Sequence, residues 1–283
     1  MDRLPSWHRQ KAAPSGQETA ALLGELGLHT VCESARCPNR GDCFARHTAT
    51  FLVLGDICTR RCTFCAVNKG TPTPVDEGEP ERLVRAAERL ALHYVVVTSV
   101  TRDDLPDGGA VHFVRVVESL HARGMKAEVL IPDFAESSEA IAAVVKARPE
   151  VINHNVETVP RLYPEVRPKA DYERSVRLLH AVKRLDRSIL TKSSLMVGLG
   201  ETRDEVHAVM RDLREAECDL LTIGQYLQPT PGHHPVVEFV PPHEFAEYAR
   251  AGLALGFAGV AAAPLVRSSF RAAELYAQAK RPV

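Results

Sequence analysis

The chain has 283 residues, of which 45% are hydrophobic and 25% are charged, and its formal net charge is −1. This balance is typical of a globular protein with a large core, and it excludes a disordered chain. Because the net charge is close to zero, the sequence predicts neither a nucleic acid nor a membrane as a partner.

The N-terminal segment MDRLPSWHRQKAAPSG lacks the apolar core of a signal peptide. No apolar run approaches the roughly 18 residues that a membrane span needs. We therefore expect a cytoplasmic protein. Seven cysteines in a reducing compartment argue against a disulfide framework and favour metal binding or catalysis.

The apolar pattern alternates between short runs rich in β-branched residues and longer segments with helical periodicity. Such alternation is typical of repeated β-α units around a parallel sheet. We expect six units, with strands at residues 50–54, 94–100, 127–132, 151–156, 189–198 and 220–227. Helices are expected to begin at residue 79 and to span residues 110–123, 138–147, 172–185 and 202–216.

Three segments follow from this pattern. Residues 1–49 precede the first strand, residues 50–228 hold the six units, and residues 229–283 form a tail with two helices. Prolines at positions 229, 231, 235, 241 and 242 mark the joint before the tail. We predict an α/β fold, a partial (β/α)6 barrel of the TIM type with an N-terminal extension and a C-terminal helical tail.

Six of the seven cysteines form two triplets of different spacing. The second triplet, Cys58, Cys62 and Cys65, follows the first predicted strand, at the end of a parallel barrel where active sites lie. A structural zinc site is disfavoured because it needs four protein ligands, and neither histidines nor paired cysteines accompany the triplet. Three buried structural cysteines are disfavoured because the residues between them are polar. Three thiolates suit a four-iron cluster with one iron left open.

The spacing Cys-x3-Cys-x2-Cys after the first strand of an α/β barrel resembles the radical S-adenosylmethionine (SAM) superfamily. The resemblance implies that the open iron of a 4Fe-4S cluster binds the amino and carboxylate groups of SAM. An electron from the cluster would then cleave SAM to methionine and a 5′-deoxyadenosyl radical. Cys58, Cys62 and Cys65 would be metal ligands with a catalytic role.

The first triplet, Cys32, Cys37 and Cys43, resembles the auxiliary-cluster motif of the lipoyl synthase family. Other segments resemble that family in the same order, and together they cover most of residues 30 to 270. These segments are ATFLVLGDICTRRCTFCAV, VVVTSVTRDDLPDGGA, EVLIPDF, NHNVETV, LMVGLGET, LTIGQYLQPT and PLVRSSF. The resemblance implies a second 4Fe-4S cluster, bound by the first triplet.

Ser269 is the fourth ligand of this auxiliary cluster by the same resemblance, and so has a catalytic role. Taken alone, a Ser-Ser pair before an apolar helical run is more often a helix N-cap. Oxygen is a poorer partner for iron than thiolate, which suits a cluster that is opened. To reach the first triplet, the tail is expected to fold back over the barrel mouth. Phe270 stands where the family usually has tyrosine, which removes a ring hydroxyl but leaves the ligands intact.

Candidate SAM contacts lie at the carboxyl ends of the predicted strands, where short hydroxyls, amides and carboxylates suit the polar groups of SAM. Asn155 and Glu157 point the same way by period two and fit a ribose diol. His154, which lies between apolar and polar neighbours, is as readily a structural histidine as a ligand. The other candidates are Thr98 and Ser99 for the methionine end, Lys192 and Ser194 for the carboxylate, and Gln225 and Tyr226 beside the adenine.

The resemblance implies a lipoyl synthase activity, the insertion of two sulfur atoms at C6 and C8 of an octanoyl chain. That chain is amide-linked to a lysine of a carrier protein. Each lipoyl group would use two SAM molecules, and the auxiliary cluster would be consumed as sulfur donor. The implied partners are octanoylated lipoyl domains (E2 subunits of 2-oxoacid dehydrogenases and the glycine cleavage H protein), an electron donor such as flavodoxin or ferredoxin, and an iron-sulfur carrier protein that rebuilds the cluster.

Two other functions stay open at this point. A radical SAM methylthiotransferase acting on RNA also has an auxiliary cluster, but the near-neutral charge and the lack of a basic domain count against it. An iron-sulfur electron carrier or redox sensor would not need a six-unit barrel with loops suited to SAM.

Overall fold

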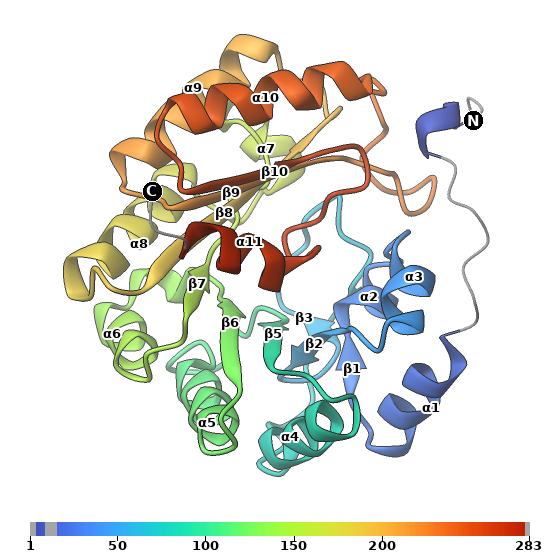
Figure 1. The fold of residues 1–283 in the computed structure, drawn as a ribbon, viewed down its shortest axis with the longest axis vertical. Coiled ribbons are helices and arrows are strands. Elements are labelled where there is room, and N and C mark those ends of the chain that lie inside the picture. The colour runs from blue at the N-terminus through green and yellow to red at the C-terminus, as the bar shows by residue number, and fades with distance from the viewer. Residues whose placement is uncertain (1–3, 9–15, 281–283) are drawn as a thin grey trace.

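Eight strands of the described residues form one sheet, in the order β1-β2-β5-β6-β7-β8-β9-β10. The computed structural model describes residues 4–8 and 16–280 of the chain (Figure 1). The six predicted strands are confirmed as a run of parallel neighbours. They are β2 (Thr50–Val53), β5 (Tyr94–Ser99), β6 (Lys126–Leu130), β7 (Val151–Asn153), β8 (Leu190–Val197) and β9 (Leu220–Gln225). Because β1 and β10 end this order without pairing to each other, the described barrel is open along one side.

The end of β7 differs from the predicted boundary, since the strand stops at Asn153 and not at residue 156. Glu157 then adopts a left-handed backbone with φ of 64°. An isolated bridge from Glu157 to Leu195 of β8 continues the pairing. A left-handed backbone is uncommon for a residue with a Cβ, and it persists where the surroundings fix it. The chain therefore leaves the sheet early at the carboxyl end of β7.

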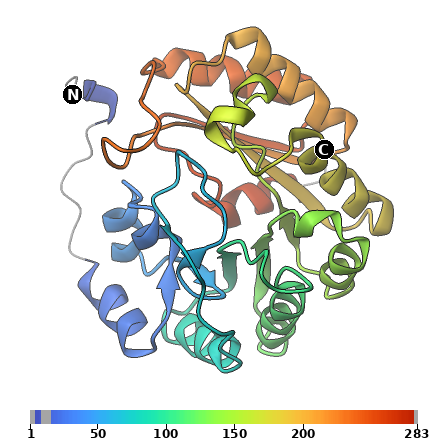
Figure 2. The ribbon, with the colours of Figure 1, turned by 180° about the vertical axis from the view of Figure 1, so that it is seen from behind.

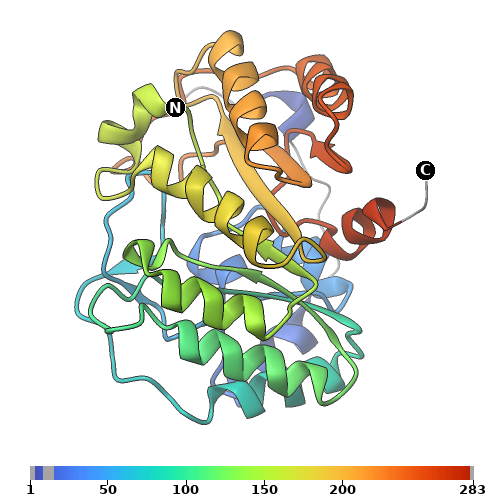
Figure 3. The ribbon, with the colours of Figure 1, turned by 90° about the vertical axis from the view of Figure 1, so that its left-hand side faces the viewer.

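The five predicted helices cover the outer face of the sheet (Figure 1). They are α4 (Glu79–Arg89), α5 (Ala110–His121), α6 (Ser138–Lys146), α8 (Tyr172–Leu185) and α9 (Arg203–Glu215). Thr202, predicted as the first residue of its helix, is instead the N-cap of α9. Its side chain accepts a hydrogen bond from the backbone of Glu205, whose carboxylate bonds back to the cap. Figure 3 shows α5, α6 and α8 side by side on this face.

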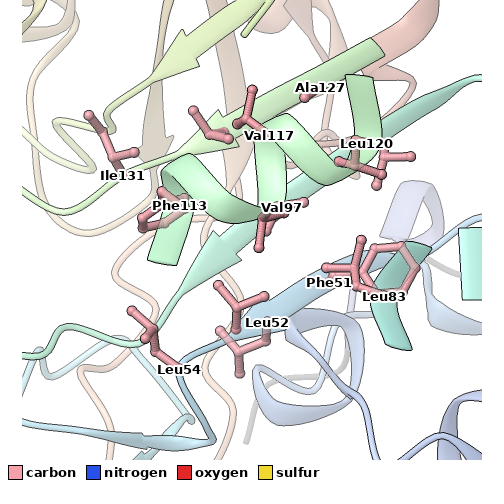
Figure 4. Packing of buried hydrophobic residues seen from close by; sticks show 14 of the residues in the cluster. Phe51, Leu52, Leu54, Leu83, Val97, Phe113, Val117, Leu120, Ala127 and Ile131 are labelled. Carbon is pink, nitrogen blue, oxygen red and sulfur yellow. The ribbon is translucent and has the colours of Figure 1, made fainter. Parts of the chain in front are cut away.

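Apolar side chains fill the space between the helices and the sheet. Phe113, Val117 and Leu120 recur on one face of α5 and are fully buried. They belong to the same core cluster as Val97 of β5 and Ala127 of β6, and Figure 4 shows them together. Burying one large apolar side chain stabilises a fold by about 1.5–3 kcal/mol. This layer holds the strands that carry the candidate site.

The N-terminal extension packs at the β2 edge of the sheet. It contains α1 (Gln17–Glu25), β1 (His29–Thr30), α2 (Val31–Ser34) and α3 (Arg40–Ala45). Strand β1 pairs antiparallel with β2, so it places the first cysteine triplet beside the barrel. The sequence did not predict β1, because two residues show no periodicity.

The tail contains the two expected helices, α10 (Pro242–Ala254) and α11 (Ala272–Ala279). It also contributes β10 (Gly259–Ala262), which pairs in parallel with β9 and extends the sheet. The small residues of β10 lack the β-branched pattern of the other strands, which is why this strand was missed.

Helix α11 lies across the amino-terminal ends of the barrel strands. Leu275 packs against Val151 and Leu220, the first residues of β7 and β9. The ring of Tyr276 lies 5.3 Å from that of Tyr94, the first residue of β5. The loop that carries the second triplet projects from the opposite end, as a comparison of Figures 1 and 2 shows.

The segment between β10 and α11 crosses the open side of the barrel. A Cβ at Gly224 of β9 would lie 2.0 Å from the carbonyl oxygen of Val266, so only glycine permits this close backbone approach. Beyond it, Ser269 lies beside Thr50, at the amino end of β2. The tail was expected to bring Ser269 to the first triplet over the barrel mouth, and this expectation is wrong. The segment that carries Ser269 runs along the open side of the barrel to the amino end of β2.

We predict that Leu275→Ala lowers the free energy of unfolding by about 2–4 kcal/mol, because it leaves a cavity where α11 meets the strand ends. Urea denaturation measures the change. Gln278→Ala, an exposed position of the same helix, is the matched control and should change little. If the two substitutions lower the free energy of unfolding equally, the packing of Leu275 against the strand ends does not stabilise α11.

Candidate active site

One cavity of about 470 Å³, here the central cavity, lies inside the partial barrel. Its wall includes residues of both cysteine triplets and of the tail. These are Cys32, Cys37, Cys58, Cys62, Cys65, Arg267, Ser268 and Ser269. Cys43 is not on this wall, but it lies close enough to Cys37 for their charges to interact. The fold therefore brings together two groups of thiols that the sequence places on separate loops.

The second triplet occupies the loop between β2 and α4. A parallel pair of two-residue strands, β3 (Ile57–Cys58) and β4 (Asn68–Lys69), ties the two ends of this loop together. Within it, the Cys65 amide donates to the carbonyl of Cys62 over 3.3 Å. Backbone hydrogen bonds thus fix the loop before any ligand binds.

Arg60, between the first two cysteines of this loop, fastens it to two neighbouring strands. Its guanidinium donates to both carboxylate oxygens of Asp103 over 2.9 and 3.0 Å, and to both of Asp133 over 2.6 and 2.9 Å. Arg60 and Asp133 are both buried. Burial alone would raise the pKa of Asp133, but the hydrogen bonds and charge of Arg60 hold it at about 2. The loop is therefore held by a buried ion pair to Asp133 and by a second ion pair to Asp103, which is exposed.

Arg167 lies between the second triplet and the end of β7. Its side chain donates to the carbonyls of Asn155 and Val156 over 3.0 and 3.1 Å. Burial raises the pKa of the Cys62 thiol, while the nearby charge of Arg167 and a hydrogen bond from it oppose that rise. Arg167 thus favours the thiolate form of Cys62, which is the form that binds metals.

The first triplet spans α2 and α3, beside the amino end of β2. Burial raises the pKa of Cys32 to about 12 and that of Cys43 to about 11. Thr50 opposes this at Cys32 through hydrogen bonds to the thiol, and its hydroxyl also donates to Ser269 Oγ over 2.8 Å. Thr50 therefore joins Cys32 and Ser269 at one point of the cavity wall.

The donor set fits iron-sulfur clusters. All seven cysteines lie in the described residues and are free of disulfides. Among the described residues, no three His, Cys, Asp or Glu side chains are grouped as ligands of a single metal ion. A cluster places different demands on its ligands, because each thiolate binds a separate iron. Each triplet offers three thiols for this purpose. Five of the six thiols belong to residues that line the central cavity, and Cys43 lies near Cys37.

Polar atoms without partners mark where a second ligand fits. Within the described residues, Ser99 Oγ and Asn155 Oδ1 are buried without a hydrogen-bond partner, and both residues line the central cavity. Asn155 Nδ2 donates to Glu157 Oε1 over 2.9 Å, so these two side chains lie together as predicted. Burial raises the pKa of Glu157, with Arg167 and Asn155 opposing the shift. Leaving buried polar atoms unpaired is costly, so a polar ligand stabilises this region.

The remaining predicted SAM contacts divide into two groups. Thr98 and Ser194 line the cavity, although the Thr98 hydroxyl donates to the carbonyl of Leu130 over 3.1 Å. Lys192 does not line it: its ammonium is fully buried and donates to Glu128 over 2.7 Å. The suggestion that Lys192 reaches the SAM carboxylate is therefore corrected, because its charge is already paired inside the barrel.

Gln225 and Tyr226 line the cavity, but their polar atoms hold the tail. The Gln225 amide donates to the carbonyl of Glu238 over 2.8 Å and accepts from the Val240 amide over 2.8 Å. The Tyr226 hydroxyl donates to the carbonyl of His234 over 2.6 Å. The polar atoms of both residues are therefore used to hold residues 229–240 at the barrel mouth. Only the apolar surfaces of Gln225 and Tyr226 can contact a ligand in the cavity.

His154 is a structural histidine. Its ring nitrogens lie 2.8 Å from the Ile131 carbonyl and 3.1 Å from Ser175 Oγ. Burial lowers the pKa of His154 to about 4, which keeps the ring neutral.

Sequence reasoning missed Arg60, Asp133 and Arg167. Arg60 and Asp133 stood within segments that resembled the family, but nothing in their spacing showed that they pair across 73 positions. Arg167 carried no signal of its own, because it follows a short helix, α7 (Tyr163–Val166), outside those segments.

The sequence was compared with known proteins. The Radical SAM superfamily profile matches residues 52–213. The lipoyl synthase of Caldanaerobacter subterraneus subsp. tengcongensis is 57% identical over 272 residues, which cover 95% of this chain and 96% of that protein. The lipoyl synthase of Caldicellulosiruptor saccharolyticus is 56% identical, with coverage of 96% and 97%. The chain belongs to the lipoyl synthase family.

Solved structures with a similar fold share little sequence identity with this chain. The hydrogenase maturase HydG of Carboxydothermus hydrogenoformans has a TM-score of 0.57 and 14% identity, covering 86% of this chain and 65% of that one. SuiB of Streptococcus suis bound to S-adenosylmethionine has a TM-score of 0.56 and 11% identity, covering 72% and 45%. These likenesses confirm the fold predicted from the sequence.

Two further features lie outside the site. Cys218, which belongs to neither cysteine triplet, is fully buried. No helix in the described part of the chain is long and apolar enough to cross a membrane.

We predict that Arg60→Gln lowers the free energy of unfolding at pH 7 by up to about 3–5 kcal/mol, because it leaves the buried Asp133 with only the longer contact of 3.5 Å to Arg174. The pKa of Asp133 in the folded state is depressed, so its stabilising effect is present above the unfolded pKa of about 4 and is lost as pH falls toward 2. The substitution should therefore move acid unfolding to higher pH.

Urea denaturation across a pH series measures both effects. Arg61→Gln is the matched control, since Arg61 is the exposed neighbour in the same loop. If both variants unfold alike at every pH, the ion pairs of Arg60 do not hold the loop.

Proposed function

We propose that this protein is a lipoyl synthase that inserts sulfur at C6 and C8 of an octanoyl chain carried on a lysine of a lipoyl carrier domain. One observation carries the proposal: the second cysteine triplet, Cys32 and Cys37 of the first, and Ser269 line one cavity inside a radical SAM barrel. Family membership at 57% identity over nearly the whole chain supports it.

The proposed ligand sets come from the cysteine spacing and the family resemblance, and the lining of the central cavity supports them. Cys58, Cys62 and Cys65 hold one 4Fe-4S cluster, whose fourth position is filled by SAM. Cys32, Cys37, Cys43 and Ser269 hold the auxiliary cluster. When bound, the first cluster supplies the electron that cleaves SAM, and the second supplies the sulfur atoms.

The chain's own residues supply position and charge. Arg60 fixes the loop of the second triplet, and Arg167 provides a buried positive charge beside Cys62 and Glu157. Asn155 and Ser99 offer unpaired polar atoms to SAM, and Glu157 offers a carboxylate for a ribose diol. The buried position of these groups limits access of water to the reaction.

Substrate enters as part of another protein, so the cavity must admit a lysine arm with its octanoyl chain. The cavity wall is apolar at Leu52, Val96 and Leu130, which suits an alkyl chain. We further propose an electron donor of the flavodoxin or ferredoxin kind and an iron-sulfur carrier protein as partners.

The decisive assay uses protein reconstituted with iron and sulfide under anaerobic conditions, then given dithionite, SAM and an octanoyl-lysyl peptide. We expect 5′-deoxyadenosine and a thiolated peptide, both measured by mass spectrometry. Deoxyadenosine that does not depend on the peptide would reject the lipoyl function. Its formation only with RNA would favour a methylthiotransferase, and its absence with every substrate would leave an electron carrier.

A second prediction concerns the oxygen ligand. We expect Ser269→Cys to bind the auxiliary cluster more tightly and to reduce thiolated product at least about tenfold, while deoxyadenosine still forms, because thiolate binds iron better than a hydroxyl oxygen. Ser268→Cys, one position away on the same wall, is the control. Normal sulfur transfer by Ser269→Cys would show that oxygen ligation is not needed to open the cluster.

A further inference from the structure

Arg267 lines the central cavity and belongs to the tail segment that crosses the open side of the barrel. The backbone of this segment is fixed on both sides of it. Asn39 Nδ2, in the loop of the first triplet, donates to the carbonyl of Leu265 over 2.7 Å, and the Thr50 hydroxyl donates to Ser269 Oγ over 2.8 Å. Arg267 is therefore held between two contacts with residues of the auxiliary site.

The side chain of Arg267 lies near both β9 and the first triplet. Its guanidinium donates to the carbonyl of Val266 over 2.6 Å, and a Cβ at Gly224 of β9 would lie 3.4 Å from one of its nitrogens. Burial lowers the pKa of Arg267, and the nearby charge of Cys37 opposes that shift. The positive charge thus lies close to a proposed ligand of the auxiliary cluster.

No carboxylate of the described residues 4–8 and 16–280 forms an ion pair with Arg267. His8 lies close enough for the charge of Arg267 to act on it, but it supplies no negative charge. Burial and the charge of Arg267 both lower the pKa of His8, so its ring is neutral at pH 7.

The other arginines of the cavity wall are placed differently. Arg60 is paired with two aspartates, Arg167 interacts with the charge of Glu157, and Arg36 is exposed to solvent. Arg267 is partly buried and has no such carboxylate among the described residues. Burying a charge without a partner is costly, so a cation in this position implies a ligand that supplies the anion.

The position of Arg267 selects among the ligands of the proposed function. The unpaired atoms suited to SAM, Ser99 Oγ and Asn155 Oδ1, lie at the ends of β5 and β7, whereas Arg267 lies beside Cys37 and Ser269. A 4Fe-4S cluster bound by thiolates has a net negative charge, which increases when the cluster is reduced. The net charge and the surroundings of such a cluster set its reduction potential.

We propose that Arg267 is the counter-ion of the auxiliary cluster, which it holds in the site by charge and whose reduction potential it raises. The inference deepens the proposed function and rests on it. In the apoprotein the same positive charge has no anion to neutralise it. Removing the charge therefore acts in opposite directions on the apoprotein and on the loaded protein.

The experiment uses the full chain with Cys58→Ala, Cys62→Ala and Cys65→Ala, so that a cluster can bind only at the first triplet. In this background the native Arg267 is compared with Arg267→Met and Arg267→Lys. Arg271→Met is the matched control, because Arg271 is an exposed arginine of the same segment. Each chain is loaded with iron and sulfide under anaerobic conditions.

The first measurement is the reduction potential of the auxiliary cluster, titrated electrochemically and followed by electron paramagnetic resonance. We expect Arg267→Met to lower the potential by at least about 59 mV, which is a tenfold change in the ratio of reduced to oxidised cluster for a one-electron couple. Arg267→Lys should keep most of the native potential, because it keeps the charge. Arg271→Met should leave the potential unchanged.

The second measurement is urea denaturation of the apoproteins. The midpoint for Arg267→Met should equal or exceed that of the native residue, because methionine keeps much of the packing and removes the unneutralised charge. This result also shows that the variant folds. A midpoint that falls equally in Arg267→Met and Arg267→Lys would overturn the inference, because Arg267 would then have a structural role.

An unchanged potential in Arg267→Met would overturn the inference as well. If the potential is unchanged and binding of an octanoyl-lysyl peptide is lost, Arg267 belongs to the substrate site instead. If the chain with native Arg267 binds no cluster at the first triplet, the proposed function fails together with the inference. A cluster that binds with an unchanged potential overturns the inference alone.

Discussion

The hydrogen bond from Thr50 to Ser269 joins the first barrel strand to the C-terminal tail. The arrangement of the candidate site depends on this contact. Thr50 begins the first barrel strand and also contacts the thiol of Cys32. The open sheet makes this contact possible, because a closed barrel would leave no side along which the tail could pass. The tail fills this open side of the barrel. The same open side lets Cys32 and Cys37 of the first triplet line the central cavity.

Burial then sets the chemistry of the cavity. Water is kept from the thiols of Cys32, Cys43 and Cys65, and this raises their pKa values to about 11 or 12. Such thiols stay protonated near neutral pH until a metal displaces the proton. At the second triplet, the buried cation Arg167 opposes the same effect of burial on the pKa of Cys62. The site is therefore arranged for ligand exchange with iron and not for free thiolates.

The sequence predicted the parts of this structure that repeat. Six strands and five helices followed from periodicity and caps, and the triplets followed from spacing. Strands β1 and β10 could not be predicted, since two or four small residues carry no pattern. Lys192 was misassigned because a lysine at a strand resembles an anion-binding group, whereas its carboxylate partner, Glu128, lies 64 positions away. The pairing of Arg60 with Asp133 was invisible for the same reason: sequence shows which groups carry charge, but not which of them share one buried space.

The contact between the tail and the first barrel strand has a consequence for the order of synthesis. A growing chain folds from its N-terminus as it is made. All ligands of the second triplet, and every strand that surrounds it except β10, exist once residue 225 has been added. The first triplet is translated earlier, yet its proposed partner Ser269 is added only after all the barrel strands. The proposed site whose cysteines are made first is thus completed last, and a nascent or truncated chain would hold the second triplet in place beside a first triplet that lacks Ser269.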